Sequence, residues 1–258
     1  MSAASIHPSR EPKAQYLLRV GDTCLILAQR LSEWCGHAPV LEEDIALANH
    51  ALDLLGQARG LLTCAGQLGP VVLDEDQLAF LREERDYLNV TLAELPRGDF
   101  AWTVVRNAML ATFLKLLWER LQASADAEVA AIAGKAIKEA RYHQQHAADW
   151  VVRLGDGTEV SRQRVEAALD ALWRYGPELF DADAVDAHAR ASGLGPSWDE
   201  LREPWLAEMR AILVEAGLAE PGPSAFTSQG KRGIHSEHMG HMLAEMQSLQ
   251  RAYPGGAW

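Results

Sequence analysis

A glutamate and two histidines lie within eight residues of one another in the stretch KAIKEARYHQQHAADW, residues 135–150. Glu139, His143 and His146 are spaced i, i+4 and i+7, so a helix would place all three side chains on one face. In helical bundles that hold two iron ions, two helices each supply a Glu-x-x-His pair and two others each supply a Glu. The stretch could therefore belong to a di-iron site.

Neither register of this helix completes a Glu-x-x-His pair. Three residues after Glu139 stands Tyr142, and three residues before His143 stands Ala140. Residues three apart project to the same side of a helix, which is what lets one carboxylate and one imidazole reach a single metal ion. Without that spacing, the stretch is interpreted as what remains of a ligand helix.

The helix expected at 41–67 lacks the pair as well. Asp53 is followed three residues later by Gly56, and His50 is preceded by Leu47. At about 100° per residue, Asp53 points away from the apolar stripe of this helix, so we expect the inward positions to be hydrocarbon. That stripe comprises Leu47, Ala51, Leu54 and Ala58.

The helix expected at 100–123 has no acidic residue between Asp99 and Glu119. The ligand set is therefore incomplete on several helices, and we expect no catalytic or cofactor-binding residue in this chain. Glu139, His143 and His146 stay as weak metal candidates. The alternative for these three is structural pairing, since buried histidine and glutamate side chains also form hydrogen-bonded pairs without a metal.

A second histidine cluster occurs in GIHSEHMGHMLAEMQ near the C-terminus, with His235, His238 and His241 at every third residue. Spacing of three drifts around a helix by about 60° per step, so the three rings would not share a face. We interpret this stretch as a polar helix start, with Ser236 or Gly233 near the cap, and its role is left open.

The elements that carry these residues are predicted to be helices, because apolar residues recur at spacings of three and four with almost no strand signal. Asp74 and Ser161 are expected to be N-caps. Residues 1–13 are expected to form a flexible arm on a single domain that spans 1–258. The expected helices lie at 14–35, 41–67, 76–95, 100–123, 127–154, 161–176, 198–217 and 234–252.

The order of these helices predicts an all-α, ferritin-like four-helix bundle with a crossover helix and additional C-terminal helices. The crossover would be 76–95. A generic helical bundle of another topology is the alternative that periodicity leaves open. The helix at 100–123 is apolar nearly all round, so it is either the centre of the bundle or covered by a partner chain. We expect this helix to expose apolar surface to a partner, so that a charge at Leu110 or Leu114, whichever faces solvent in the isolated chain, would abolish co-purification.

Composition excludes several classes of function. The chain has 258 residues, of which 48% are hydrophobic, and its net charge of −12 opposes nucleic-acid binding. No apolar run reaches the 18 residues of a membrane span, and the N-terminus lacks the apolar core of an export signal. Cys24, Cys35 and Cys64 have no metal-like spacing, which fits a reducing cytoplasm.

Four long blocks of the sequence, in order along nearly the whole chain, resemble the C-subunit family of bacterial phenylacetyl-CoA epoxidases (1,2-phenylacetyl-CoA mono-oxygenases). The blocks are YLLRVGDTCLILAQRLSEWCGHAPVLEEDIALANHALDLLGQAR, EERDYLN, KEARYHQQHAADWVVRLGDGT and GKRGIHSEHMGHMLAEMQSLQRAYPGGAW. The resemblance implies a ferritin-like fold and a role in aerobic phenylacetate catabolism.

The resemblance further implies a non-catalytic structural subunit of a multicomponent mono-oxygenase. The di-iron centre would belong to a homologous catalytic A subunit, and a reductase subunit with flavin and iron–sulfur groups would supply electrons from NADPH. This chain itself would carry no cofactor, and self-association is left open. The competing hypotheses are a stand-alone di-metal oxidoreductase and a ferritin-like metal-binding protein.

Overall fold

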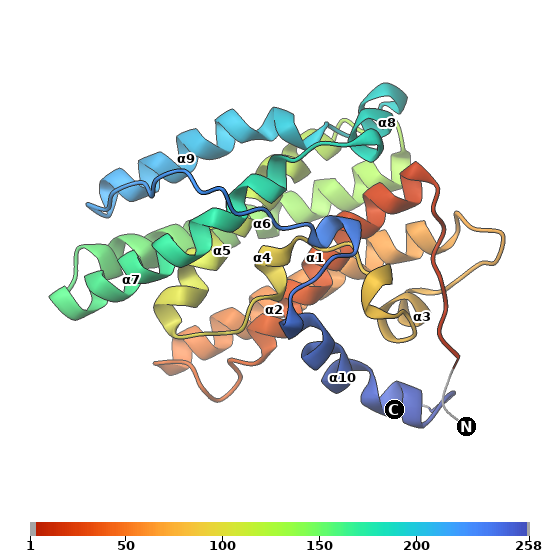
Figure 1. Cartoon of the computed structure of the whole chain (residues 1–258), viewed down its shortest axis with the longest axis horizontal. Helices are drawn as coiled ribbons and strands as arrows, with labels where there is room; N and C mark the ends of the chain where they lie inside the picture. The colour runs from red at the N-terminus through yellow and green to blue at the C-terminus, as the bar shows by residue number, and fades with distance from the viewer. Residues whose placement is uncertain (1–3, 257–258) are drawn as a thin grey trace.

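The computed structural model describes residues 4–256 of the chain. Four long helices dominate it and form two antiparallel pairs, α1 with α2 and α5 with α6 (Figure 1). The two pairs meet chiefly where α2 packs against α6. Within residues 4–256 there are isolated bridges but no strand, as expected for an all-α fold. The bounds of the long helices are Pro12–Ser32 for α1, Leu41–Gly66 for α2, Phe100–Leu121 for α5 and Ala127–Gly155 for α6.

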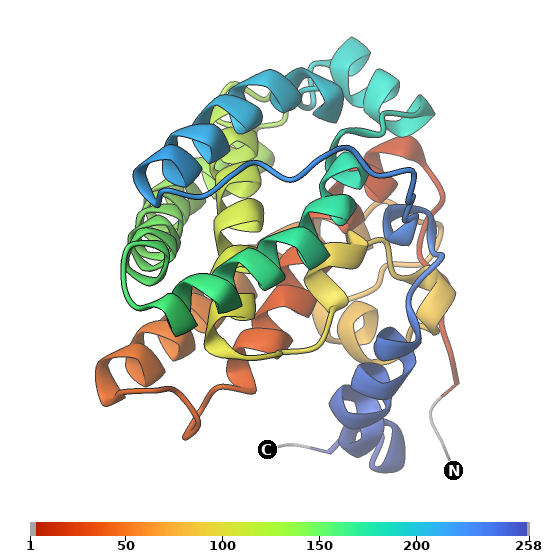
Figure 2. The same ribbon diagram turned by 60° about the vertical axis from the view of Figure 1, so that its left-hand side comes forward.

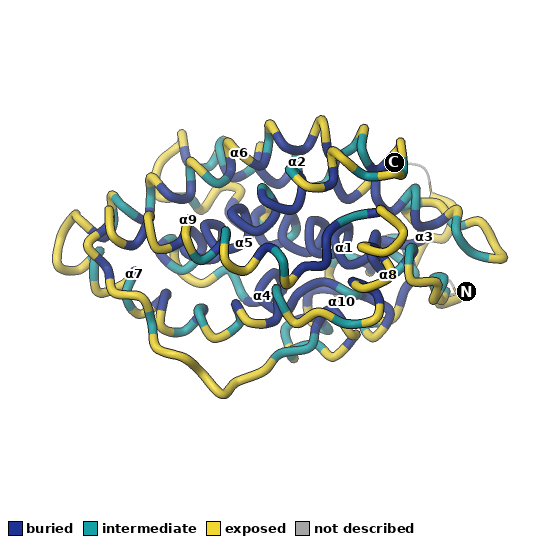
Figure 3. Tube along the Cα trace, turned by 90° about the horizontal axis from the view of Figure 1, so that it is seen from above, coloured by how far each residue is buried: buried dark blue, intermediate teal, exposed yellow. Residues whose placement is uncertain are grey.

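Helix α5 is the centre of the bundle. Leu110 is fully buried and Leu114 is 2% exposed, so neither faces solvent, and the expectation that this helix exposes apolar surface to a partner is wrong. Figure 3 shows α5 as a mostly buried trace inside the exposed outer helices. By length and composition α5 could cross a membrane, but 83% of its most apolar window is buried inside this fold. It is therefore the core helix of the bundle, because its neighbours cover it on every side.

The predicted helix at 76–95 is broken into short pieces: α3 (Glu75–Phe80), the 3₁₀ turn η1 (Glu84–Asp86) and α4 (Thr91–Glu94). The cause is a buried carboxylate on α1. Asp22 pairs with Arg82, and it also accepts the backbone N–H of Leu88 at 2.9 Å. An N–H that reaches another helix cannot bond to the carbonyl four residues earlier, so the helix cannot continue.

The C-terminal third wraps the bundle with shorter elements, and the segment after α9 runs back across the bundle to α10 (Figure 2). Helix α8 was not expected from the sequence; it is capped by Asp183 and ends at Gly193 with a φ of 71°. The elements are α7 (Glu159–Leu172), η2 (Trp173–Phe180), α8 (Ala184–Ser192), η3 (Trp198–Leu201), α9 (Arg202–Glu215), η4 (Gly230–Arg232) and α10 (Glu237–Ala252).

One of the two predicted caps is confirmed. The side chain of Asp74 accepts the backbone N–H of Gln77 at the start of α3. Ser161 is not the cap of α7. That position belongs to Thr158, whose backbone N–H donates to the Ser161 hydroxyl at 2.9 Å.

The N-terminal arm expected at 1–13 is described from residue 4 onward, and residues 1–3 lie outside the described residues. The described part lies extended beside residues 81–86, where the N–H of Ile6 donates to the carbonyl of Leu81 at 3.0 Å. The ring of His7 lies 3.0 Å from a carboxylate oxygen of Asp86. These contacts attach the arm to the short elements that replace the predicted crossover helix.

Candidate functional site

Glu139, His143 and His146 lie on the face of α6 that packs against α2, and each has its own partner there. The amide of Gln57 donates to Glu139 at 3.0 Å. The ring of His143 lies 3.0 Å from a carboxylate oxygen of Asp53. The ring of His146 contacts Glu43. We call these three pairs, together with His50, the α2–α6 seam.

His50 lies in the middle of the seam. Its ring centroid is 4.2 Å from that of His143 and 4.8 Å from that of His146. Its Nε2 atom is buried and has no hydrogen-bond partner among the described residues. Burial, with the two neighbouring histidines adding to it, lowers the pKa of His50 to about 2. The ring is therefore neutral at physiological pH, because protonation would bury an unpaired charge.

The two histidine–carboxylate pairs of the seam differ in how far they are exposed to solvent. Burial also lowers the pKa of His143, although the hydrogen bond with Asp53 acts in the opposite direction. The side chain of Asp53 is 36% exposed, whereas that of Glu43 is 11% exposed. The rings of His143 and His146 each contact their own carboxylate on α2, so the seam contains two histidine–carboxylate pairs side by side.

The inward face of α2 is not purely hydrocarbon, contrary to the expectation from its sequence. Glu43, His50 and Gln57 are all buried and recur every seven residues, so they form a polar stripe beside the apolar one. The apolar stripe of α2 packs on α1, while the polar stripe faces α6. The spacing of these polar residues, i, i+7 and i+14, can be seen in the sequence. It does not match the Glu-x-x-His spacing, so these residues were not predicted to belong to the site.

Gln57 connects the seam to the centre of the bundle. Its side-chain oxygen accepts from the indole N–H of Trp118 on α5 at 3.2 Å, and the thiol of Cys24 on α1 lies 3.7 Å from the same atom. Its amide nitrogen donates to Glu139 on α6. Because the Gln57 amide has hydrogen-bond partners on α1, α5 and α6, it fixes the axial position of α2 relative to all three helices.

The donors of the seam do not fit a bridged di-iron centre. Such a centre requires carboxylates and imidazoles that converge on shared metal ions. Here each histidine nitrogen that faces a carboxylate is taken by a different one, on a different turn of α2. Within residues 4–256, no group of three His, Cys, Asp or Glu side chains is arranged to hold a metal ion.

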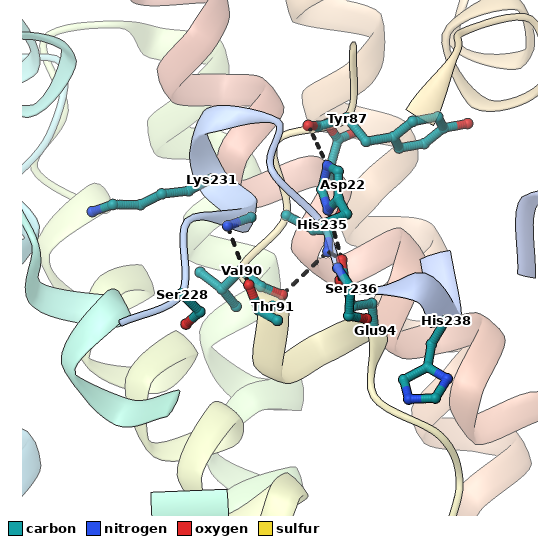
Figure 4. Close-up of polar contacts among 12 residues, drawn as sticks. Asp22, Tyr87, Val90, Thr91, Glu94, Ser228, Lys231, His235, Ser236 and His238 are labelled. Carbon is teal, nitrogen blue, oxygen red and sulfur yellow. Dashed lines mark hydrogen bonds and ion pairs between the residues drawn. The ribbon is translucent and has the colours of Figure 1, made fainter. Parts of the chain in front are cut away.

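The second histidine cluster is split by the structure. Ser236 is the N-cap of α10, as expected, but His235 precedes the helix and its side chain is fully buried (Figure 4). Its Nδ1 lies 2.7 Å from Glu94, and its Nε2 lies 2.9 Å from the carbonyl oxygen of Tyr87. His238 is half-buried near the start of α10, and His241 is exposed one turn further on.

The surroundings of His235 favour its protonated form, in which both ring nitrogens donate hydrogen bonds. Both ring nitrogens face oxygens that only accept hydrogen bonds from it, and a neutral ring can donate from one nitrogen only. Burial by itself lowers the pKa of His235, but the hydrogen bond and charge of Glu94 outweigh it, and the pKa is raised. His235 and Glu94 thus form a buried ion pair.

Two buried carboxylates tie residues 228–236, which we call the strap, to the body of the fold. Glu94 accepts the backbone N–H of Ser236 at 2.6 Å in addition to His235. Glu178 accepts the backbone N–H of Lys231 at 3.0 Å and the hydroxyl of Ser228 at 2.6 Å. Neither carboxylate was expected to be functional, because neither stands near the strap in the sequence.

Comparison with known proteins gives a match over the whole chain. The model of the family described as "Phenylacetic acid catabolic protein" matches residues 1–258. The C subunit of the 1,2-phenylacetyl-CoA epoxidase of Escherichia coli (strain K12) is 50% identical over 243 residues. That alignment covers 94% of this chain and 98% of the relative.

Proposed function

This chain belongs to the phenylacetic acid catabolic protein family, and we propose that it is the non-catalytic structural subunit of a multicomponent di-iron mono-oxygenase. The complex would epoxidise the aromatic ring of phenylacetyl-CoA in aerobic phenylacetate catabolism, in the cytoplasm. The observation that carries the proposal is the identity of 50% across nearly the full length of a relative named as the C subunit of that epoxidase.

The geometry of the α2–α6 seam supports a structural rather than a catalytic role. His143 and His146 are each engaged by a separate carboxylate, and His50 is held neutral by burial. Paired in this way, the side chains hold α2 in position against α6. The alternative, a stand-alone di-metal oxidoreductase or metal-binding protein, requires these residues to converge on shared ions.

The partners we propose are a homologous ferritin-like catalytic A subunit and a reductase subunit. The di-iron centre would lie in the catalytic subunit, and the reductase would use NADPH with flavin and iron–sulfur groups. This chain would hold the catalytic bundle in its active shape and offer a docking surface.

With α5 inside the fold, the contact surface has to be formed by outer helices. Helix α2 exposes Leu41 at 71%, Ile45 at 53% and Leu52 at 65% of their surface, and Tyr142 on the adjoining α6 is 57% exposed. Apolar side chains grouped on one exposed face are typical of protein–protein contacts. We therefore assign the contact with the catalytic subunit to this face of α2 and α6.

The test is co-purification with the catalytic subunit, followed by iron content and turnover. Leu52→Glu should abolish co-purification and turnover together while the helical content stays unchanged. Val214→Glu is the matched control, since Val214 is an exposed apolar residue (79%) on α9, away from α2 (Figures 1 and 2). If the catalytic subunit with its reductase epoxidises phenylacetyl-CoA at the full rate without this chain, the proposed function is wrong.

A further inference from the structure

Arg106 interrupts the mostly apolar helix α5 at a completely buried position. Its Nη1 atom donates to the carbonyl oxygens of Leu95 at 2.7 Å and Pro96 at 3.3 Å, which anchors the guanidinium to the turn between α4 and α5. The Nε and Nη2 atoms are buried as well, and neither has a hydrogen-bond partner among the described residues. The fold therefore satisfies one side of this charged group and leaves the other side without an acceptor.

The two atoms without an acceptor form the edge of the guanidinium that binds anions. One N–H of Nη2 runs parallel to the N–H of Nε in the plane of the group, so a single anion can accept both hydrogen bonds. Because Nη1 is held by backbone carbonyls, the orientation of this edge is fixed. Arg106 thus presents a preformed fork of two donors inside the bundle.

The surroundings of Arg106 contain more positive than negative charge. Burial, followed by the charge of Arg30 on α1, lowers the pKa of Arg106 to about 9, and Glu33 acts in the opposite direction. The carboxylate of Glu33 is engaged by Arg30 at 2.6 Å, and Arg97 donates to the backbone carbonyl oxygen of Glu33 at 2.7 Å. Three guanidinium groups therefore gather around one carboxylate where α1 ends and α5 begins.

The chain itself does not balance this charge. With a pKa of about 9, Arg106 stays protonated at neutral pH. Arg30 also contacts Glu94, but only through the backbone carbonyl oxygen, and the carboxylate of Glu94 is paired with His235. A buried charge is costly unless an opposite charge and hydrogen bonds compensate it, so a counterion from solution is the remaining source of compensation.

We propose that the Nε and Nη2 atoms of Arg106 bind a small monovalent inorganic anion of the chloride type, with Arg30 adding to the positive field. A small ion suits the site because the side chain is completely buried, so a larger anion or a side chain of a partner protein would have to displace part of the fold. The bound ion would tie together the end of α1, the turn after α4 and the start of α5. The site belongs to this chain alone and does not require the proposed function.

The first experiment is thermal unfolding of the full-length chain as chloride is varied, with sodium gluconate replacing sodium chloride so that the ionic strength stays constant. An ion that binds only the folded state raises the folding equilibrium constant about tenfold for each tenfold rise in concentration above its Kd. For a chain of this size, that change corresponds to a rise of about 3–6 °C in melting temperature. A melting temperature that does not respond to chloride would overturn the proposal.

Arg106→Met removes the guanidinium while keeping a long side chain, and it should abolish the dependence on chloride. Arg164→Met is the matched control, since Arg164 is exposed on α7 and the same change there should leave the dependence as it is in the wild type. Retention of the dependence in Arg106→Met would assign the effect to another site. Equal loss in Arg164→Met would show a general effect of charge, and either result would overturn the proposal.

A crystal structure of the wild-type chain grown with sodium bromide locates the ion directly and remains decisive if Arg106→Met fails to fold. Bromide can be distinguished from water by its anomalous scattering. An anomalous peak within hydrogen-bond distance of both Nε and Nη2 of Arg106 is the expected result. A water molecule at this edge, with no anomalous signal, would overturn the proposal.

Discussion

Replacing His235 with alanine should be among the most damaging single changes in the C-terminal third of the chain. The side chains of His235 and Glu94 are both fully buried. Without the imidazolium, Glu94 would keep the N–H groups of Ser236 and Asn89 but would lose the positive charge that compensates its own. The carbonyl oxygen of Tyr87 would also lose its donor.

The magnitude follows from the cost of leaving a buried charge unpaired. Removing one partner of a buried ion pair destabilises a protein by about 3–5 kcal/mol. For a chain of this size, 1 kcal/mol corresponds to about 2–4 °C in melting temperature, so His235→Ala should lower it by about 6–20 °C. The strap would loosen first, because Glu94 holds it at Ser236 as well as at His235.

The same pair makes stability depend on pH in a definite direction. The pKa of His235 is raised in the folded chain, so the folded state holds its proton more tightly than the unfolded state does. The stabilisation is therefore fully present below the unfolded pKa of about 6.5 and is lost as pH rises through the folded pKa. The wild type should lose stability relative to His235→Ala over that window.

Thermal unfolding of both proteins across this pH range measures the effect, with hydrogen exchange of residues 228–236 as the local readout. His241→Ala is the control, since His241 is an exposed histidine on α10 and should leave both measurements unchanged. If the stabilities of the wild type and His235→Ala change with pH in parallel, the buried ion pair is not the source of the pH dependence. Equal destabilisation by His241→Ala would likewise contradict a specific role of His235.

Three further predictions concern the bundle. His143→Ala leaves Asp53 without its partner and should cost about 1–3 kcal/mol in an unfolding titration, while turnover of the assembled complex persists; lost turnover at unchanged stability would indicate a direct role. Leu114→Glu places an unpaired charge in the core and should destabilise the isolated chain by about 3–5 kcal/mol, so a normal circular dichroism melt would contradict the central position of α5. Metal analysis of the purified chain should find far less than one iron per chain, and two tightly bound irons would contradict the structural role.

The sequence was sufficient for the main helices. The apolar period of three to four residues predicted α1, α2, α5 and α6 to within a few residues at each end, because amphipathic helices must turn one face to a core. The same reasoning failed for 76–95. There the periodicity was helical, but Asp22 on a distant helix takes Arg82 and the N–H of Leu88, and such competition leaves no local trace.

The candidate site was predictable only in part. Spacing alone placed Glu139, His143 and His146 on one helix face, and the structure confirms that they share the face of α6 toward α2. Which residues of α2 meet them depends on how far α2 is rotated and at which level it lies. Neither quantity is encoded in the periodicity of a single helix, so the polar stripe containing His50 was overlooked.

The sequence by itself determined that the chain is helical, that its helices bury one face, and that the Glu-x-x-His pairs of a di-iron bundle are absent. The tertiary structure decided which polar groups are paired. His235 meets Glu94 across 141 positions of the chain, and Lys231 meets Glu178 across 53. Local patterns report which face of a helix avoids water, whereas a buried charge is compensated by whichever opposite charge or dipole the fold brings within hydrogen-bond distance.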